Sequence, residues 1–177
     1  MGSTQKEHRV KLITGLIYRD SEQYLAIKPF LLRAFGPIDY ESEELAFSHT
    51  DYYENELGTG LKRRFLSFSR LIPPQKLAGI KVRTNKFEKQ KALKGKRTIN
   101  IDPGYLDMAK LVMASTKDFC HRIYLDHNIF AEVTLVYKKD SFTFWDWTYP
   151  DYRTAKYIDI FNHIRQTYEQ QICNPLT

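Results

Sequence analysis

The chain has 177 residues, of which 42% are hydrophobic and 27% are charged, and its formal net charge is +6. Aromatic residues make up 14% of it, a fraction that excludes a disordered or collagen-like chain. No apolar run approaches the roughly 18–20 residues of a membrane span, and the polar start Met1–Val10 lacks the apolar core of a secretory signal. Cys120 and Cys173 form no recognisable motif, so we expect a reduced, cytoplasmic protein.

The positive charge is concentrated in one segment. Residues 37–60 contain seven acidic side chains and no lysine or arginine, whereas residues 61–97 contain thirteen basic side chains and one acid, Glu88. A basic surface concentrates phosphate-bearing partners and speeds their encounter. Neighbouring segments often pack together, however, so it is equally expected that the two segments neutralise each other.

The first part of the chain alternates predicted strands and helices. Strands are expected over residues 10–18, 44–50, 62–71 and 97–101, the last closed by the turn Asp102-Pro103-Gly104. Helices are expected over 21–35, kinked at Pro29, and from Pro73-Pro74 to Gly95. The order β-α-β-β-α-β predicts a ferredoxin-like unit.

The remaining elements extend this unit. We expect a helix over 105–115, a hairpin of strands 121–125 and 129–137, a strand over 142–147, and a helix over 152–172. If the aromatic residues before that last helix form a plug that anchors it, Asp151 is expected to be its N-cap. Residues 1–9 are expected to form a flexible tail and residues 10–173 a single α+β domain.

Several sequence blocks are similar to a known family. They are Phe47–Tyr53 (FSHTDYY), Asn100–Tyr105 (NIDPGY), His121–Tyr124 (HRIY), Ala131–Leu135 (AEVTL) and Trp147–Arg153 (WTYPDYR). With the blocks in this order and at this spacing, the chain resembles the uncharacterised prokaryotic family called domain of unknown function 4416. The resemblance covers about residues 10–168. The resemblance implies no established activity, although some members carry the label GTP-binding protein.

The sequence lacks the loop with which classical GTPases hold phosphate. That loop needs a glycine, four residues and then Gly-Lys-Ser/Thr leading into a helix. Here Gly95-Lys96 is followed by Arg97 and a predicted strand, and Gln90 occupies the position of the first glycine. Asn85–Glu88 (NKFE) resembles the guanine-reading motif Asn-Lys-x-Asp but ends in Glu and lies within a predicted helix. These departures exclude a classical GTPase and leave other nucleotide-binding geometries open.

His49 and Asp51 are the first candidate catalytic residues. Their spacing of two would put both on one face of a strand that continues to Tyr53. Histidine and carboxylates at short spacing supply a general base or metal ligands. No recognisable motif fixes a metal here, so we assign none. The alternative is a solvent-facing acidic loop.

Asp102 stands at the predicted end of a strand, where ligands often bind. Tyr105, Lys110 and Lys117 follow it closely, and the two lysines would supply cations for a phosphate if they face the same cleft. The alternative is that Asp102-Pro103-Gly104 is simply a favourable turn.

The predicted hairpin holds His121 and Arg122. A three-residue loop sets Leu125 opposite Ile129 and therefore Arg122 opposite Glu132, which predicts a cross-strand ion pair worth some tenths of a kcal/mol. His121 is either a catalytic residue or a histidine satisfied within the core.

Aromatic residues are dense over residues 145–153. Tyr149 could stack on a base while Arg153 pairs with a phosphate. The alternative is an aromatic plug that anchors the last helix.

We therefore expect a protein that binds a phosphate-bearing ligand, such as a nucleotide, in a cleft lined by His, Asp, Lys and Arg. The sequence leaves open whether it is an enzyme and which cofactor, if any, it uses. Candidate catalytic residues are His49, Asp51, Asp102 and His121, and candidate ligand-binding residues are Arg63, Lys81, Tyr105, Lys110, Lys117, Arg122, Tyr149 and Arg153. The alternatives are an RNA- or DNA-binding module that uses residues 61–97 and a non-catalytic protein that forms oligomers or binds a partner. We expect no membrane partner.

Overall fold

The computed structural model of the chain describes residues 8–48 and 50–174. Its nine strands form one antiparallel sheet in the order β2-β4-β1-β5-β6-β8-β7, with β3 beside β4 and β9 beside β8. The strands are β1 (Lys11–Tyr18), β2 (Ile38–Glu41), β3 (Leu45–Ala46), β4 (Lys62–Phe68), β5 (Ile99–Leu106), β6 (Lys110–Ser115), β7 (Arg122–Asp126), β8 (Ile129–Lys138) and β9 (Ser141–Phe144). The helices are α1 (Ser21–Phe35), α2 (Glu54–Leu57), α3 (Leu77–Gln90) and α4 (Ala155–Cys173), with short 3₁₀ turns η1 (Asp51–Tyr53), η2 (Pro74–Lys76) and η3 (Pro150–Arg153).

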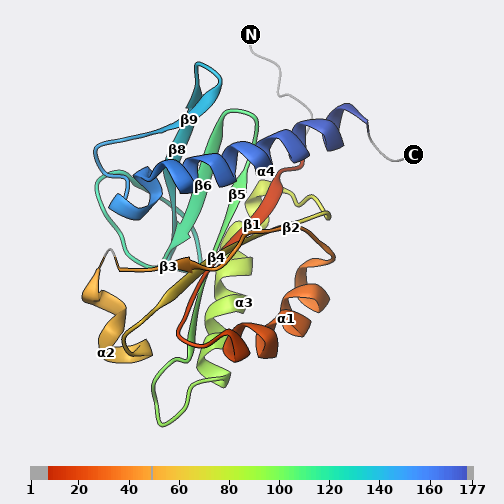
Figure 1. Ribbon diagram of the computed structural model, residues 1–177. Helices are drawn as coiled ribbons and strands as arrows, with labels where there is room; N and C mark the ends of the chain where they lie inside the picture. The colour runs from red at the N-terminus through yellow and green to blue at the C-terminus, as the bar shows by residue number, and fades with distance from the viewer. Residues whose placement is uncertain (1–7, 49, 175–177) are drawn as a thin grey trace.

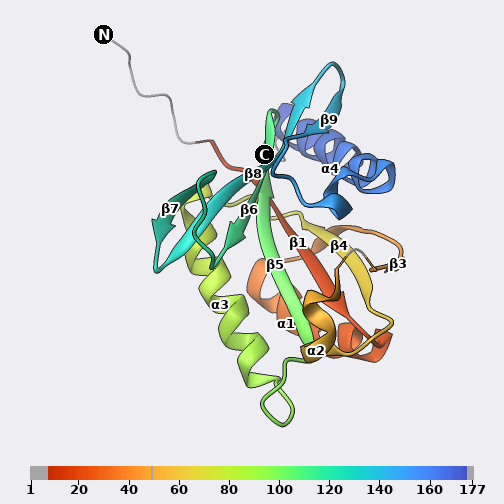
Figure 2. The same ribbon diagram turned by 90° about the vertical axis from the view of Figure 1, so that its left-hand side faces the viewer.

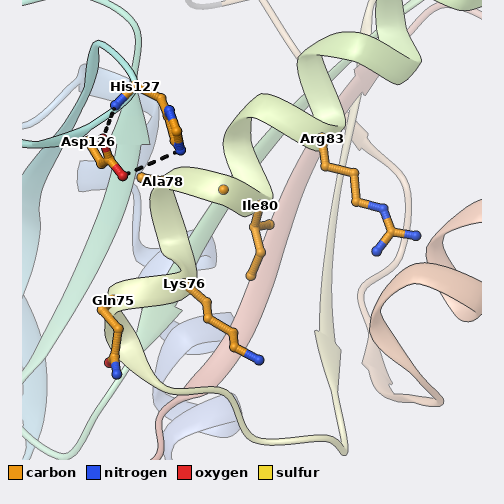
Figure 3. A pocket seen from close by; sticks show the side chains of 8 residues that line it. Gln75, Lys76, Ala78, Ile80, Arg83, Asp126 and His127 are labelled. Carbon is orange, nitrogen blue, oxygen red and sulfur yellow. Dashed lines mark hydrogen bonds and ion pairs between the residues drawn. The ribbon is translucent and has the colours of Figure 1, made fainter.

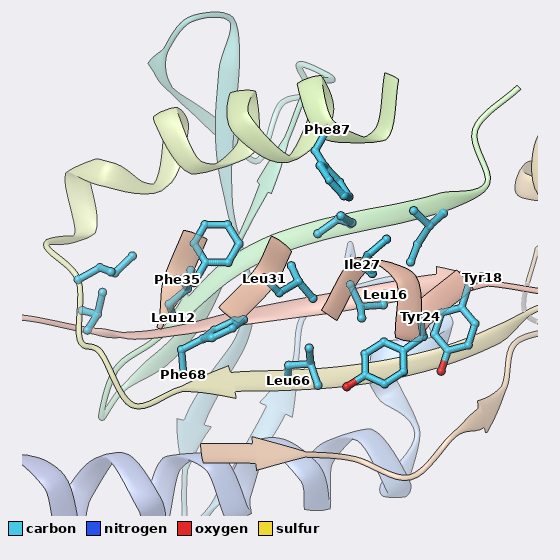
Figure 4. Packing of buried hydrophobic residues seen from close by; sticks show 14 residues of the cluster. Leu12, Leu16, Tyr18, Tyr24, Ile27, Leu31, Phe35, Leu66, Phe68 and Phe87 are labelled. Carbon is cyan, nitrogen blue, oxygen red and sulfur yellow. The ribbon is translucent and has the colours of Figure 1, made fainter. Parts of the chain in front are cut away.

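Helices cover both faces of the sheet. α1 and α3 lie on one face and α4 lies on the other (Figure 1 and Figure 2). Successive residues of a strand point to opposite faces, so Leu16 of β1 joins the core under α1 and α3, whereas Ile13 joins the core under α4. Figure 4 shows the first of these cores, with Leu31 and Phe87 of the two helices above Leu66 of β4. Burial on both faces explains why β1 is apolar almost throughout.

The predicted helices over 21–35, after Pro73-Pro74 and over 152–172 are confirmed in type. α1 continues through Pro29 and ends before Gly36, whose φ of 96° favours glycine. The predicted strand over 44–50 is reduced to the two residues of β3. β2 was not predicted, and the sheet is larger than the sequence indicates.

Two predictions between residues 97 and 115 are wrong. β5 runs straight through Asp102-Pro103-Gly104, which pairs with β1 instead of turning. The predicted helix over 105–115 is the end of β5 followed by β6. β6 is buried on both faces, with Leu111 against the α4 core and Val112 against α3. Such a strand lacks the polar alternation that distinguishes a strand from a helix.

The acidic and basic segments contact each other. Glu44 forms an ion pair with Lys62, and Glu56 forms one with Arg97. Glu41 binds Arg64, at 2.6 Å between Oε1 and Nη1. This neutralises part of the basic segment, while the lysines on the outer face of α3 stay exposed. Within the described residues no helix has the length and apolar character needed to cross a membrane.

Candidate functional site

Strands β5 and β6 are paired along only part of their length. Their Cα partners run from Gly104–Met113 to Leu106–Leu111. Before Gly104, β5 pairs only with β1, and after Met113, β6 pairs only with β8. A cavity of about 1020 Å³ lies where the two strands separate, lined by both strands and closed by α3, η1 and η3.

Two side chains of α3 replace the missing strand along the edge of β5. The main-chain N–H of Ile101 donates to Oε1 of Glu88 at 2.7 Å, and Nζ of Lys81 donates to the carbonyl oxygen of Ile101 at 3.0 Å. Lys81 and Glu88 are seven residues apart, or two helical turns, so they share one face of α3. Pro103, which has no N–H to donate, follows on the strand just before the first β6 pair.

Asp102 is the polar centre of the cavity. Lys81 Nζ donates to its Oδ1 at 3.0 Å, Asn100 Nδ2 donates to its Oδ2 at 2.6 Å, and Arg63 Nη1 lies 3.8 Å from Oδ2. Burial opposes ionisation, but Lys81 and Arg63 outweigh it and hold the pKa of the Asp102 carboxyl below its usual value. About a quarter of the side chain (23%) is exposed in the cavity, so the carboxylate can still accept a hydrogen bond from a ligand.

Arg63 lies at the base of the same cavity, with 4% of its side chain exposed. Nη2 donates to Oδ2 of Asp151 at 2.8 Å, and the guanidinium lies 5.0, 5.2 and 5.5 Å from the ring centres of Phe47, Phe65 and Tyr152. Its Nε and Nη1 have no hydrogen-bond partner among the described residues. A buried donor without a partner costs about 1–3 kcal/mol, so we expect a ligand or water there.

Gly15 of β1 makes room for this guanidinium, because a Cβ at that position would lie 3.1 Å from Nη1 of Arg63. The N-cap role that the aromatic-plug alternative gave to Asp151 is wrong. Asp151 is the buried counter-ion of Arg63, and α4 is capped by Thr154, whose Oγ1 accepts from the N–H of Tyr157 at 3.4 Å.

The rim of the cavity carries further cations. Arg97 is neutralised by Glu56 and Glu88, with its Nη1 at 3.1 Å from Oε2 of Glu88. Lys89 of α3 and Lys117, which follows β6, also line the cavity and are exposed. Neither has an ion pair with a described side chain, although Nζ of Lys117 lies 4.0 Å from the ring centre of Tyr52.

The predicted cross-strand ion pair is confirmed. Arg122 lies opposite Glu132, with Nε donating to Oε2 at 2.9 Å, and Nε2 of His121 lies 3.1 Å from the same oxygen. The predicted three-residue loop is wrong, because Asp126 pairs with Ile129 across a two-residue turn. A bulge in β7 restores the register at Arg122.

The structure brings half of the predicted site residues to this cavity. Those that line it are Arg63, Lys81, Asp102, Lys117, Arg122 and Tyr149. His121 contacts the cavity-lining Glu132 but does not line the cavity itself.

Other predicted residues lie elsewhere. Nζ of Lys110 binds Asp107 at 2.9 Å, and Tyr105 packs against the hydrophobic cores. Arg153 donates from Nε to the carbonyl oxygen of Thr148 at 2.6 Å, which holds the segment before α4.

The role predicted for His49 and Asp51 stays a prediction. His49 and the side chain of Asp51 lie outside the described residues. The strand expected to carry both is wrong, because residues 51–53 form the 3₁₀ turn η1.

Sequence reasoning missed Glu88, Asn100 and Arg97 as members of the site. One signal was present, since Glu88 is the single acid in the basic segment, and an isolated acid among lysines indicates a paired role. Asn100 stands two residues before Asp102 on the same strand, a spacing that puts both on one face.

A second hollow of about 370 Å³ lies between the start of α3 and the β7–β8 turn (Figure 3). Its polar side chains, such as Lys76, Arg83 and His127, are all exposed, and Nε2 of His127 lies 3.4 Å from Asp126. No buried polar group points to a ligand there. In the described part of the chain, no group of three or more His, Cys, Asp or Glu side chains is placed to hold a metal ion.

Comparison with known proteins identifies the family. No curated protein and no solved structure matches the chain. One family model does match, described as "Domain of unknown function (DUF4416)", and it covers residues 8–168. These residues include both strands that border the cavity and the α3 side chains that close it. Because the match spans most of the chain, the protein belongs to the DUF4416 family.

Proposed function

We propose that the protein binds a phosphate-bearing small ligand, such as a nucleotide, in the cavity between β5 and β6. The observation that carries this proposal is that Lys89 and Lys117 line the cavity without an ion pair to any described side chain. The volume of about 1020 Å³ is at the upper end of the roughly 300–1,000 Å³ of small-molecule sites.

The charges of the cavity support this reading. Among the described residues, six cationic and five acidic side chains line it. Each of the five acids has a cation of the cavity within ion-pair distance, and these pairs engage four of the six cations. Lys89 and Lys117 remain, so an arriving group with about two negative charges, such as a phosphate, neutralises them without disrupting an existing pair.

The rest of the lining suits a ligand that also has a ring and hydrogen-bond donors. Tyr52 and Tyr149 are 59% and 53% exposed at the rim, and such faces stack on planar rings. Asp102 accepts hydrogen bonds from Lys81 and Asn100, and the exposed 23% of its side chain leaves room to accept another from a ligand hydroxyl. A nucleotide offers a phosphate, a ring and hydroxyl donors together, which is why we favour this class.

Isothermal titration of the full chain tests the proposal. The ligands are inorganic phosphate, pyrophosphate and a set of ribonucleoside mono-, di- and triphosphates. We expect one of these to bind, and Lys117→Ala and Lys89→Ala each to weaken it about tenfold, since a hydrogen bond to a charged group is worth about 1.5–3 kcal/mol. Lys86→Ala is the matched control, because Lys86 is exposed on α3 outside the cavity. No binding by any of them, or equal weakening by all three variants, contradicts the proposal.

Two broader features belong to the same proposal. Elements β1 to β5 with α1 and α3 are proposed to form a ferredoxin-like unit, supported by the strand order β2-β4-β1-β5, antiparallel pairing throughout, and both helices on one face. A cytoplasmic location is proposed because Cys120 and Cys173 are free and exposed.

A second candidate function is nucleic-acid binding by the outer face of α3. Lys76, Arg83, Lys86 and Lys91 are exposed there, and none has an ion pair with a described side chain. Binding through these residues would follow the phosphate backbone, so affinity for single-stranded RNA or duplex DNA should fall steeply between low and moderate salt. An affinity that hardly changes with salt contradicts this candidate.

A further inference from the structure

The inside of the cavity between β5 and β6 presents hydrogen-bond acceptors and a donor side by side. Oδ1 of Asp102 accepts from Nζ of Lys81 at 3.0 Å, and Oδ2 accepts from Nδ2 of Asn100 at 2.6 Å. A carboxylate has about four lone-pair sites, so each oxygen can accept a second hydrogen bond. The ammonium of Lys81 has three donors, of which the carbonyl oxygen of Ile101 and Oδ1 of Asp102 take two. Among the described residues, one donor of Lys81 is therefore unused beside the unused lone pairs of Asp102.

A hydroxyl is the ligand group that matches this arrangement. It both donates and accepts, so it can donate to Asp102 while it accepts from Lys81. Two hydroxyls on neighbouring carbon atoms can use both carboxylate oxygens at once. A phosphate does not fit there. Although burial opposes ionisation, Lys81 and Arg63 hold the pKa of Asp102 below its usual value, so a phosphate would meet a like charge.

The rim of the cavity presents different groups from the inside. Lys89 and Lys117 are exposed at the rim, and so are the rings of Tyr52 and Tyr149, whereas only 23% of the Asp102 side chain is exposed. In a ribonucleotide the base leaves the sugar at C1′ and the phosphate leaves it at C5′, while the two hydroxyls occupy the opposite edge, at C2′ and C3′. A ligand with its phosphate on the lysines and its base on a tyrosine of the rim therefore turns its hydroxyl edge inward, toward Asp102.

We propose that Asp102 and Lys81 bind the 2′- and 3′-hydroxyls of a ribonucleotide, and that the cavity therefore selects ribonucleotides over deoxyribonucleotides. This inference rests on the proposed function and adds to it the class of sugar and the orientation of the ligand. Asn100 holds the carboxylate in place from its other side. Selection follows because a sugar that lacks a hydroxyl covers Asp102 and Lys81 without pairing them, and a polar group that loses water without gaining a partner is costly. Sites built to hydrogen-bond a hydroxyl reject analogues without it for this reason.

Isothermal titration of the full chain with matched ligands tests the inference. Each ribonucleoside 5′-mono-, di- and triphosphate is compared with its 2′-deoxy and 3′-deoxy counterparts, which carry the same base and the same phosphates. We expect the ribonucleotide that binds to do so at least about tenfold more tightly than either deoxy form, corresponding to about 1.4 kcal/mol. Equal affinities overturn the inference and leave the proposed function standing, whereas no binding by any nucleotide contradicts both.

Two variants test which residue contacts the sugar. Asp102→Asn keeps the shape of the side chain and removes its charge. Hydrogen bonds to a neutral acceptor are roughly half as strong as those to a charged one, so the ratio of ribonucleotide to deoxyribonucleotide affinity should fall about threefold. Lys117→Ala is the matched control. It should weaken both ligands by the same factor and leave the ratio unchanged, because Lys117 is proposed to contact only the phosphate.

Circular dichroism checks that both variants are folded, and the comparison of ligands on the wild type depends on neither of them. An unchanged ratio in folded Asp102→Asn, or an equal fall of the ratio in both variants, excludes Asp102 as the residue that contacts the sugar hydroxyls.

Discussion

The carboxylate of Glu88 accepts a hydrogen bond from the main-chain N–H of Ile101, at 2.7 Å between Oε1 and N. A helix side chain therefore takes the hydrogen bond that a neighbouring strand would otherwise make. Buried backbone donors are almost always paired, so a sheet can open between β5 and β6 only if something replaces the ladder. The cavity and the pairing of Glu88 with Ile101 thus depend on each other.

Glu88→Ala should reduce the free energy of unfolding by about 1–3 kcal/mol, because it leaves the N–H of Ile101 buried and unpaired. The substitution also removes one partner of Arg97. Urea denaturation followed by circular dichroism measures the change. Glu54→Ala is the control, since Glu54 is exposed and forms no ion pair with a described side chain, and it should stay within about 0.5 kcal/mol. Equal stability of the two variants would mean that the Glu88–Ile101 bond is replaced by water.

Glu88 also makes the stability depend on pH. Burial, aided by the nearby Asp102, raises the pKa of Glu88 above its ordinary value of 4.5. Because the pKa of Glu88 is higher in the folded state than in the unfolded state, protonation of Glu88 stabilises the fold. This contribution is complete below pH 4.5 and is lost as the pH rises through the pKa of Glu88 in the folded protein. The stability of the wild type relative to Glu88→Gln should therefore fall with rising pH across this window. Urea titrations of both proteins at several pH values measure it, and parallel curves would contradict the assignment.

The sequence predicts the helices and the strands β1 and β4 well, but it misplaces the elements between residues 97 and 115 and misses β2. The helix over 21–35 and the pair Arg122–Glu132 follow from local signals, namely apolar spacing and hairpin register. The latter is correct although the loop is shorter than predicted, because the bulge in β7 offsets the missing residue. Local patterns therefore locate elements whose partners are close in sequence.

The candidate site was only partly predictable, because its residues gather through pairings distant in the chain. The sequence marks Asp102 as a candidate because it stands at the predicted end of a strand. β5 does not end there, yet Asp102 lies at the centre of the cavity. Pro103 is a strong turn signal, but here it stands where β5 has β1 on one side and no strand on the other, so a missing N–H costs nothing. Asp151 reached Arg63 across 88 residues, a contact that no local spacing reveals.

Gly104→Ala should destabilise the fold strongly at the point where β5 and β6 join. A Cβ there would lie 2.6 Å from the carbonyl oxygen of Val112 and 2.5 Å from Sδ of Met113, so the two strands must move apart. Overpacking of this kind typically costs about 1–3 kcal/mol. Thermal unfolding measures the change.

Gly79→Ala is the matched control for Gly104→Ala. Gly79 lies in α3 with no atom within 4 Å of its would-be Cβ. Alanine is favoured over glycine in a helix by about 0.8–1 kcal/mol, so this variant should be more stable than the wild type. The two Gly-to-Ala changes are thus expected to shift the stability of the fold in opposite directions. A shift in the same direction would contradict the packing described at the β5–β6 junction.

Arg63→Met should be far more destabilising than Arg64→Met, although the two residues are neighbours in β4. Arg63 is 4% exposed and neutralises the buried Asp151, so its removal leaves an uncompensated buried charge, which costs about 3–5 kcal/mol. Arg64 is 17% exposed and forms an ion pair with Glu41. Without Arg64, Glu41 would still be paired with Lys28, at 2.7 Å between Oε2 and Nζ. Loss of that outer pair should cost about 1 kcal/mol or less.

A double-mutant cycle separates the ion pair from the packing of the arginine stem. If the unpaired charge of Asp151 is what destabilises the Arg63→Met variant, then adding Asp151→Asn should recover part of the lost stability. The two changes should therefore be non-additive, with an interaction energy of about 0.5–3 kcal/mol, as contacting residues show. Urea denaturation of the four proteins measures this energy. Strict additivity would mean that Asp151 holds its charge through solvent rather than through Arg63, and that the aromatic rings of Phe47, Phe65 and Tyr152 alone fix the guanidinium.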